Sequence, residues 1–256
     1  MLVTIITICY NAEKEIGKTI KSVLDQTFED YEYIIIDGKS TDKTIEIAQR
    51  VLSQYSNKNI KIISEPDRGI YDAMNKGLKL ASGEWVCMMN AGDVFASPEV
   101  LKEVFHSHIE NSISFLYSDL YKMTSYGKIF KINMFCNEYN RRLVHQCIIY
   151  RKRLHTEYGY YAVTPKLIIS DYLFFLQVPT EQIKKVNTII AIYEGRGVSE
   201  SGTWCKKQCL CADVIFGYRN FWSIYVHFIK WRIKTCLPRK IRERIRLMLS
   251  GVDVNS

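Results

Sequence analysis

The 256-residue chain lacks several features that would place it in a large class of proteins. It has no run of about 18 or more uninterrupted apolar residues, so the sequence predicts no membrane-spanning helix. An apolar run begins at residue 2, with no basic segment and cleavage site before it, so we expect no secretory signal. No repeat, low-complexity tract or linker interrupts the chain. These absences indicate a globular protein that is cytosolic or lies on a membrane surface.

The eight cysteines form no pattern typical of a metal site or a disulfide scaffold. Cys9 and Cys87 lie inside apolar runs, where a free cysteine behaves as a small buried hydrophobe. Cys205, Cys209 and Cys211 cluster, but no paired CxxC or matching histidine spacing completes a zinc site. The cysteine usage therefore favours a reducing cytosol.

Two signatures of other nucleotide-using enzymes are also missing. No GxGxxG follows the first apolar run, which disfavours a dehydrogenase with a Rossmann fold. A nucleotidyltransferase, whose sheet is similar, should carry a Gly- and Lys-rich phosphate loop at the same place, and residues 7–11 contain none.

The net charge of +8 is carried by the C-terminal part of the chain. Residues 206–256 contain eleven of the 35 Lys/Arg and three of the 27 Asp/Glu. Residues 1–205 therefore contain 24 cationic and 24 anionic side chains and carry no net charge. Such an asymmetry indicates an appended surface for an anionic partner.

Residues 221–248 mix aromatic side chains with cations in a stretch that reads as helical. On a helical projection, one face carries Phe221, Tyr225, Phe228 and Ile229, and another carries His227, Lys230 and Lys234. A basic amphipathic helix suits an anionic membrane surface, although a helix that packs its aromatics on the core gives the same pattern. Single-stranded nucleic acid also binds aromatics and cations, but nothing in residues 1–200 supports a nucleic-acid partner.

Strand and helix patterns alternate four times in the first ninety residues. Strands are predicted at residues 2–9, 33–36, 60–63 and 84–89, and helices at residues 13–26, 41–55 and 69–81. This alternation predicts a parallel sheet with helices on its faces, and ligands bind such sheets outside the carboxyl ends of the strands. The polar residues expected at that edge are Tyr10, Asn11, Asp37, and residues 65–67 and 90–93.

The pattern is less regular after residue 98. A helix is predicted to about residue 108 and another at residues 170–177, and residues from 203 onward read as helical and basic. Further strands are predicted at residues 114–118, 128–135, 144–150 and 186–193.

Eight short stretches, in order, resemble those of the bacterial family 2 glycosyltransferases. They are residues 4–11, 37–42, 65–75, 81–85, 90–93, 145–146, 170–172 and 195–199. The resemblance covers roughly residues 2–200 and implies an α/β fold of GT-A type, with a mostly parallel central sheet flanked by helices. It further implies a Rossmann-like nucleotide-binding half at residues 1–97 and an acceptor-side half at residues 98–200, followed by an amphipathic helical extension at residues 201–256.

The resemblance assigns several residues to the nucleotide-sugar donor. Asp37 matches a carboxylate that accepts a hydrogen bond from the nucleotide base, although it could instead cap the following helix, as could Asp42. Asp67 and Asn75 bracket the start of a helix whose free N–H groups suit a diphosphate, although turn chemistry explains Asp67 equally well. Lys39 either meets a phosphate or points to solvent. The remaining donor-side matches are Thr7, Tyr10, Asn11, Asn90 and Ala91.

Asp93 matches the acidic cluster that holds Mg²⁺ or Mn²⁺ against the donor diphosphate in the family. Hard cations of this kind use one or two carboxylates together with substrate phosphates. Asn90 and Gly92 occupy positions that are often Asp, so Asp93 is the last carboxylate of the cluster. The resemblance therefore implies a divalent metal at Asp93, with an affinity below that of a fully acidic cluster.

Asp171 matches the family's general base, which takes the proton of the acceptor hydroxyl. An Asp that only caps its helix is the alternative. His145 and Gln146 match a motif on the acceptor side, where a structural histidine fits equally well. Arg196, between two glycines, suits a loop that closes over phosphates, or a plain turn.

These matches together imply an inverting glycosyltransferase with a nucleotide-sugar donor, which we expect to be UDP-linked. The basic aromatic tail favours a lipid-linked saccharide acceptor, and hence a cytoplasmic enzyme on the inner face of the membrane in surface polysaccharide biosynthesis. The alternative is a non-catalytic family member that binds nucleotide or membrane as a scaffold, which the thinned acidic cluster would explain.

Overall fold

A seven-stranded sheet forms the centre of the molecule in the computed structural model, which describes residues 1–55, 59–124, 127–138, 141–193, 203–236, 238 and 241. Its strand order is β12-β6-β11-β4-β1-β2-β3. These strands are β1 (Val3–Cys9), β2 (Tyr31–Asp37), β3 (Ile60–Ser64), β4 (Trp85–Met88), β6 (Phe115–Tyr117), β11 (Ile148–Arg151) and β12 (Ile183–Lys185). Strands β3, β2, β1 and β4 run parallel, and β11 is antiparallel to both of its neighbours.

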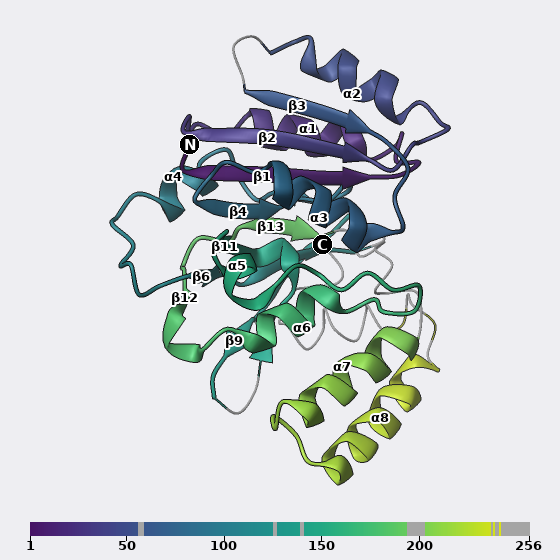
Figure 1. The fold of residues 1–256 in the computed structure, drawn as a ribbon. Coiled ribbons are helices and arrows are strands. Elements are labelled where there is room, and N and C mark those ends of the chain that lie inside the picture. The colour runs from purple at the N-terminus through teal and green to yellow at the C-terminus, as the bar shows by residue number, and fades with distance from the viewer. Residues whose placement is uncertain are drawn as a thin grey trace.

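The crossover helices cover both faces of the parallel strands. They are α1 (Ile16–Leu24), α2 (Thr44–Leu52) and α3 (Ile70–Leu80), and Figure 1 shows α1 and α3 on opposite faces of the sheet. Every residue of β1 and β2 is buried, because both faces of these strands are covered. The prediction of a mostly parallel sheet flanked by helices is confirmed.

Glu32 of β2 connects β1, β2 and the turn that precedes β4. Its carboxylate is 1% exposed and accepts hydrogen bonds at Oε1 from the Thr4 hydroxyl (2.7 Å) and from the hydroxyl and backbone N–H of Ser82 (2.7 and 2.5 Å). The next residue is Gly83, and only glycine fits there because a Cβ would lie 2.6 Å from the backbone N of Thr4. The family-like stretch at residues 81–85 therefore has a structural role in this chain.

Replacement of Glu32 by Gln is expected to lower the free energy of unfolding at pH 7 by about 3 kcal/mol. Burial opposes the charged form, but the hydrogen bonds from Thr4 and Ser82 and the charge of Lys61 outweigh it and lower the pKa of Glu32 to about 2. A depressed pKa stabilises the fold above the unfolded-state pKa of about 4.3, and this stability is lost as the pH falls toward 2. Urea unfolding of wild type and Glu32→Gln at pH 7 and pH 3 measures it, and the difference should shrink at the lower pH. The exposed Glu29→Gln is the control, and an equal difference at both pH values would contradict the assignment.

Two smaller sheets complete the described fold. A four-stranded sheet has the order β5-β13-β7-β8, and β9 pairs with β10. Their strands are β5 (Val94–Phe95), β7 (Leu120–Met123), β8 (Ile129–Ile132), β9 (Phe135–Cys136), β10 (Arg141–Arg142) and β13 (Ala191–Tyr193). The helices are α4 (Val100–Val104), α5 (Leu154–Tyr158), α6 (Ser170–Gln177) and the short 3-10 turns η1 (His145–Cys147) and η2 (Thr180–Gln182).

The strand predicted at residues 186–193 is wrong over its first part. Strand β12 ends at Lys185 and pairs with β6 in the large sheet, whereas β13 begins at Ala191 and pairs with β5 and β7. The intervening chain crosses between the two sheets, and the Ile190 N–H is held by the Ser118 hydroxyl (3.0 Å). An apolar run does not reveal such a change of partner.

The described part of the C-terminal extension forms a helical hairpin of α7 (Thr203–Ile215) and α8 (Phe221–Thr235) that projects beside α6 (Figure 1). The half-buried side of α8 carries Ile224, Phe228 and Trp231, and the Lys207 ammonium of α7 lies 5.8 Å from the Phe228 ring. Phe228 therefore faces inward, unlike the exposed Phe221 and Tyr225 with which the projection grouped it. Among the described residues, no helix is long and apolar enough to cross a membrane.

Candidate active site

Polar groups gather where the parallel strands end. Cys9, the last residue of β1, pairs in register with Asp37, the last residue of β2, and Asp37 pairs with Ser64 of β3. Asp37 is fully buried and accepts hydrogen bonds from the hydroxyls of Ser40 (2.5 Å) and Ser64 (2.6 Å). The Ser40 backbone N–H also donates to it (3.0 Å), so Asp37 organises the turn that follows β2. The Cys9 thiol also donates to Asp37 Oδ1 (3.7 Å), so the roughly four acceptor positions of this carboxylate are occupied within the protein.

Asp67 and the exposed Tyr10 meet at this edge because residue 38 is glycine. A Cβ on Gly38 would lie 2.4 Å from Asp67 Oδ2 and 3.4 Å from Tyr10 Cδ2. The other oxygen of Asp67 accepts a hydrogen bond from the N–H of Gly69 (2.8 Å), directly before α3. Turn chemistry at Asp67 is therefore present, and its second oxygen faces the end of β2.

The loops after β1 and β2 are interlocked. Asn11 and Lys39 both adopt positive φ, at 48° and 68°, and both are exposed. The Asn11 side-chain oxygen accepts from the Thr41 backbone N–H (2.9 Å), and the Asn11 backbone N–H donates to the Ser40 hydroxyl (2.8 Å). Asp42 accepts from the N–H of Thr44 (3.0 Å), so its capping alternative matches the geometry.

Two residues expected at the donor are used inside the protein instead. Thr7 is fully buried, and its hydroxyl is shared with the Met89 carbonyl (2.7 Å) and the Tyr33 hydroxyl (2.8 Å), so the donor-contact prediction for Thr7 is wrong. Asn75 is 8% exposed and its amide pairs with the backbone N–H and carbonyl of Tyr161 (3.0 and 2.8 Å). The Asn75 amide therefore secures the acceptor-side loop to α3.

Residues 90–93 form a tight turn after β4. The Asp93 N–H donates to the Asn90 carbonyl (2.9 Å), and Gly92 has φ of 105°, a conformation that favours glycine. The Ala91 N–H donates to the Ile8 carbonyl at the end of β1 (3.1 Å). The turn is thereby fixed next to the donor-side strand ends, and it directs Asp93 into the interior, where it is 5% exposed.

His145 bridges two carboxylates that lie 78 positions apart in the sequence. Its Nδ1 lies 3.0 Å from Asp171 Oδ2, and its Nε2 lies 3.8 Å from Asp93 Oδ2. The turn η1 places the ring there, and the His145 side chain is 16% exposed. The structure therefore brings the predicted base, the predicted metal ligand and the acceptor-side histidine into one cluster.

These contacts shift the three ionisable groups in different directions. Burial disfavours the charged imidazole, but Asp171 and Asp93 outweigh it and raise the pKa of His145 to about 9. Burial acts to raise the pKa of Asp171, but hydrogen bonds from His145 and the Tyr71 hydroxyl lower it overall. Burial raises the pKa of Asp93 in spite of its hydrogen bonds with His145 and Gln146. At neutral pH the closer pair, Asp171 and His145, is ionised.

Tyr71 is the functional residue that helical spacing concealed, since its periodicity indicates a core position. Its ring is buried in α3, but its hydroxyl donates to Asp171 Oδ1 at 2.7 Å. Asp171 thus has one oxygen held by Tyr71 and the other by His145. No local sequence pattern reveals this contact, because the two residues are 100 positions apart.

Asn90 supplies an oxygen that fits a hard cation. Its Nδ2 lies 2.9 Å from His145 Nε2, and its Oδ1 is buried with no hydrogen-bond partner within the part of the chain that the structure describes. A cation beside this oxygen would satisfy it. A half-turn of the amide, which lets Oδ1 accept from the charged His145 ring, would do so as well. The described residues contain no group of three His, Cys, Asp or Glu able to hold a metal alone, so a metal at Asp93 and Asn90 would need phosphate oxygens to complete its ligands.

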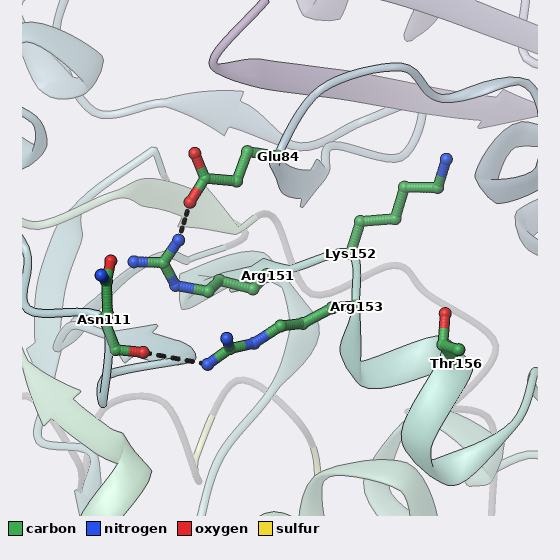
Figure 2. A pocket seen from close by; sticks show the side chains of 6 residues that line it. All are labelled: Glu84, Asn111, Arg151, Lys152, Arg153 and Thr156. Carbon is green, nitrogen blue, oxygen red and sulfur yellow. Dashed lines mark hydrogen bonds and ion pairs between the residues drawn. The ribbon is translucent and has the colours of Figure 1, made fainter.

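A hollow of about 540 Å³ lies at the opposite edge of the sheet. Figure 2 shows its lining residues, Glu84, Asn111, Arg151, Lys152, Arg153 and Thr156. Arg151 forms an ion pair with Glu84, and Arg153 donates to the Asn111 carbonyl (3.0 Å), so these cations are used within the protein. Arg151 pairs with the first residue of β4, at the end of that strand away from Asp93, so this hollow is separate from the candidate site. The predicted phosphate contact Arg196 lies outside the described residues.

Acidic and amide groups at the carboxyl ends of a mostly parallel sheet, faced by a carboxylate of α6, form the arrangement expected of a GT-A glycosyltransferase. The model of glycosyl transferase family 2 matches residues 4–146, so the chain belongs to that family and is a glycosyltransferase. A PGL/p-HBAD biosynthesis glycosyltransferase of Mycobacterium bovis is 28% identical over 185 residues, which are 70% of this chain and 71% of the relative. The Escherichia coli protein WfgD, a UDP-Glc:alpha-D-GlcNAc-diphosphoundecaprenol beta-1,3-glucosyltransferase, is 34% identical over 119 residues, or 46% of this chain and 45% of WfgD.

Solved structures share the fold. Residues 1–349 of Staphylococcus aureus TarS, in complex with UDP-GlcNAc, align with a TM-score of 0.67 at 22% identity, covering 84% of this chain and 66% of that one. The mannosyltransferase PcManGT from Pyrobaculum calidifontis, in complex with GDP-Man and Mn²⁺, aligns with a TM-score of 0.64 at 14% identity, covering 85% and 64%. The GT-A fold expected from the sequence is thereby confirmed.

Proposed function

We propose that the chain transfers a sugar from a UDP-sugar to a hydroxyl of a lipid-linked saccharide, with inversion at the anomeric carbon. The observation that carries this proposal is the position of Asp171, which faces Asp93 across the His145 ring. A general base must reach the acceptor hydroxyl on the side of the sugar opposite to the leaving diphosphate. A carboxylate on α6 and a metal-binding carboxylate after β4 meet that requirement.

The donor binds at the ends of β1, β2 and β3. The exposed Tyr10 ring offers a surface on which a base can stack, next to the turn that Asp37 holds in place. A base N–H that reached Asp37 would displace one of its present donors. Both a UDP-sugar and a GDP-sugar occur in the structures that resemble this chain. The relative WfgD is named for UDP-Glc, which favours a UDP-sugar.

A divalent cation, Mn²⁺ or Mg²⁺, is held by Asp93 and Asn90 together with the donor diphosphate. The lone carboxylate of Asp93 and the side-chain amide of Asn90 support hard-cation ligands on this turn, because both present oxygen to the same point of the chain. When bound, the cation neutralises the charge that develops on the departing diphosphate.

The acceptor hydroxyl gives its proton to Asp171. Hydrogen bonds from Tyr71 and His145 hold the carboxylate in one orientation and lower its pKa, so that it is ionised at neutral pH. Either oxygen still has a lone pair for the acceptor.

A thermal melt with UDP, GDP and CDP, each with Mn²⁺ and with chelator, tests the donor site. A ligand at 100 times its Kd should add roughly 2.7 kcal/mol, which moves Tm by a few degrees. We expect metal-dependent stabilisation by UDP, and its reduction by about 1.4 kcal/mol or more in Gly38→Ala, equivalent to at least a tenfold weaker Kd, because the new Cβ displaces Asp67. Gly17→Ala on α1, where a Cβ makes ordinary contacts, is the control. Stabilisation of Gly38→Ala equal to wild type would contradict the placement of the donor.

The face of α8 that points away from α7 supports a membrane partner. Phe221, Trp222 and Tyr225 are 69%, 74% and 56% exposed. Residues 203–236 contain six Lys/Arg and a single acid, Asp213, which is already paired with Arg219. Aromatics at a helix surface with an excess of cations suit the headgroup region of an anionic bilayer. We infer that the hairpin places the enzyme on the inner face of the cell membrane, where a lipid-linked acceptor is found.

Vesicles of phosphatidylglycerol and phosphatidylcholine are expected to bind the wild-type chain, with at least tenfold weaker binding after Phe221→Ala and Trp222→Ala are combined. Binding should also weaken at high salt, because exposed charges are screened. Co-sedimentation measures both effects, and Ile129→Ala, at an exposed position on β8, is the control. Equal binding of the double variant would contradict a docking role for α8.

The second candidate is a non-catalytic scaffold, which the single carboxylate of the turn at residues 90–93 would favour. A scaffold that binds only membrane predicts no nucleotide-dependent shift of Tm in the melt, and one that binds nucleotide predicts a shift without turnover. Turnover of any UDP-sugar by wild type excludes it.

A further inference from the structure

Helix α7 supplies the support for the segment that leads into the proposed base. Residues 159–169 contain no helix or strand. The side chains of Trp204 and Gln208 donate to the Lys166 carbonyl (2.7 and 2.6 Å), and Gln208 Oε1 accepts from the Ile168 N–H (3.0 Å). Two backbone groups shortly before Asp171, the Lys166 carbonyl and the Ile168 N–H, are therefore satisfied by the C-terminal extension.

The contact between α6 and α7 has its own small apolar cluster, separate from the main core. Its buried members are Ile169, Leu176 and Ala212. The hairpin is thereby packed against the helix that carries Asp171.

At the centre of this contact is a buried carboxylate. Asp213 of α7 is 8% exposed and accepts from the Tyr172 hydroxyl at Oδ1 (2.6 Å) and from Arg219 Nε at Oδ2 (2.9 Å). Tyr172 is the residue directly after Asp171. Arg219 lies in the connection between α7 and α8, and its backbone N–H also donates to the Asp213 carbonyl (3.1 Å).

Neighbouring residues of an α-helix point about 100° apart around its axis. A helix held at Tyr172 by Asp213 therefore has a fixed rotation, which also fixes the direction of Asp171. The C-terminal half of α6 is held separately, by the buried rings of Phe174 and Phe175 and by Arg141, which donates to the Phe175 carbonyl (2.6 Å). The Tyr172 contact therefore acts on the first turn of α6, which carries Asp171. A rotation of roughly 10° would move the Asp171 carboxylate by about 1 Å, and a displacement of that size can lower a rate about 10²-fold.

We propose that Asp213 is a positioning residue for the base. Through its hydrogen bond with Tyr172 it sets the rotation of α6, so the hairpin determines the orientation of Asp171. The inference rests on the proposed function for its kinetic consequence. Its geometric content, the dependence of the Asp171–His145 hydrogen bond on Asp213, is independent of any substrate.

The test follows the proton between His145 Nδ1 and Asp171 Oδ2 by NMR on the ¹⁵N-labelled full chain, where a hydrogen bond to a carboxylate shifts an imidazole N–H resonance downfield. His145→Gln assigns the signal by its loss. We expect Tyr172→Phe and Asp213→Asn to shift or broaden it. Tyr55→Phe, which removes a comparable hydroxyl bond to Asp25 (2.7 Å) far from the site, should leave it unchanged.

Transfer kinetics provide the second measurement. Turnover per UDP-binding site should fall about tenfold or more in Tyr172→Phe and Asp213→Asn, with KM for the donor within twofold of wild type. The double variant should be no slower than the slower single variant, because both act through one contact. An unchanged resonance in both variants, or its absence in wild type, overturns the proposal. Wild type could also show the resonance, and the two variants change it as predicted, while wild type transfers no sugar. In that case the proposed function has failed and the positioning contact has not.

Discussion

Asp171→Asn is expected to lower the rate of sugar transfer about 10³-fold, the middle of the range for loss of a general base. The amide keeps the shape of the carboxylate and can still accept from the Tyr71 hydroxyl, but it cannot take a proton from the acceptor. Its nitrogen would also face the His145 ring, whose Nδ1 is 3.0 Å away. Because Asp171 belongs to the acceptor-side half, the stabilisation by UDP and Mn²⁺ should remain.

The measurement is UDP release from UDP-glucose and UDP-N-acetylglucosamine, with the saccharide diphospho-lipid named for WfgD as the first acceptor. Tyr71→Phe is a second variant with a smaller expected effect. It removes one of the two hydrogen bonds that hold Asp171, and we expect a loss of about tenfold. The anomeric configuration of the product is read by NMR. Transfer by Asp171→Asn at the wild-type rate, or a product with retained configuration, would refute the role assigned to Asp171.

The pH dependence follows from the direction of the shift at Asp171. Its pKa is lowered below the ordinary carboxyl range, so the basic form is complete at every pH above that range. Activity should therefore show no acid limb from this group between about pH 5.5 and 8. In Tyr71→Phe the pKa of Asp171 should rise toward its ordinary value, because the lost hydrogen bond favoured the charged form.

The donor-side half was predictable because each of its elements is local. The apolar runs that became β1 and β2 and the helical spacing of α1 to α3 are set by neighbouring residues, and the strand ends follow from them. Thr7 shows where this reasoning fails. In a strand buried on both faces the period of two is lost, so the sequence does not tell whether a threonine near the strand end faces the ligand or the core.

The catalytic cluster was predictable as separate residues and not as an assembly. Asp93, His145 and Asp171 each matched a motif, but their contact depends on the turn η1 and on the packing of α6. Tyr71 was hidden because a buried tyrosine gives the same helical spacing whether or not its hydroxyl has a partner. Contacts between residues about a hundred positions apart are set by tertiary packing, which local periodicity does not encode.

Asp93→Asn and Asn90→Asp are expected to change metal binding in opposite directions. Asp93→Asn removes the last carboxylate of the turn and keeps its shape, so Mn²⁺-dependent binding of UDP should weaken by about 10²-fold or more, and transfer should fall with it. Asn90→Asp places a second carboxylate on the turn that carries Asp93, so Mn²⁺ should bind more tightly.

Titration of free Mn²⁺ by electron paramagnetic resonance, with and without UDP, measures both variants without any acceptor. The melt in chelator shows whether each variant is folded, and UDP with chelator gives the metal-free baseline. Since the charge of His145 lies beside both positions, a change caused only by its altered pairing would appear equally in chelator. Opposite shifts that appear only with Mn²⁺ therefore identify the turn at residues 90–93 as the metal site. If Asp93→Asn binds Mn²⁺ and UDP as wild type does, the cation is held elsewhere, and Asp93 instead serves as the second anchor of His145.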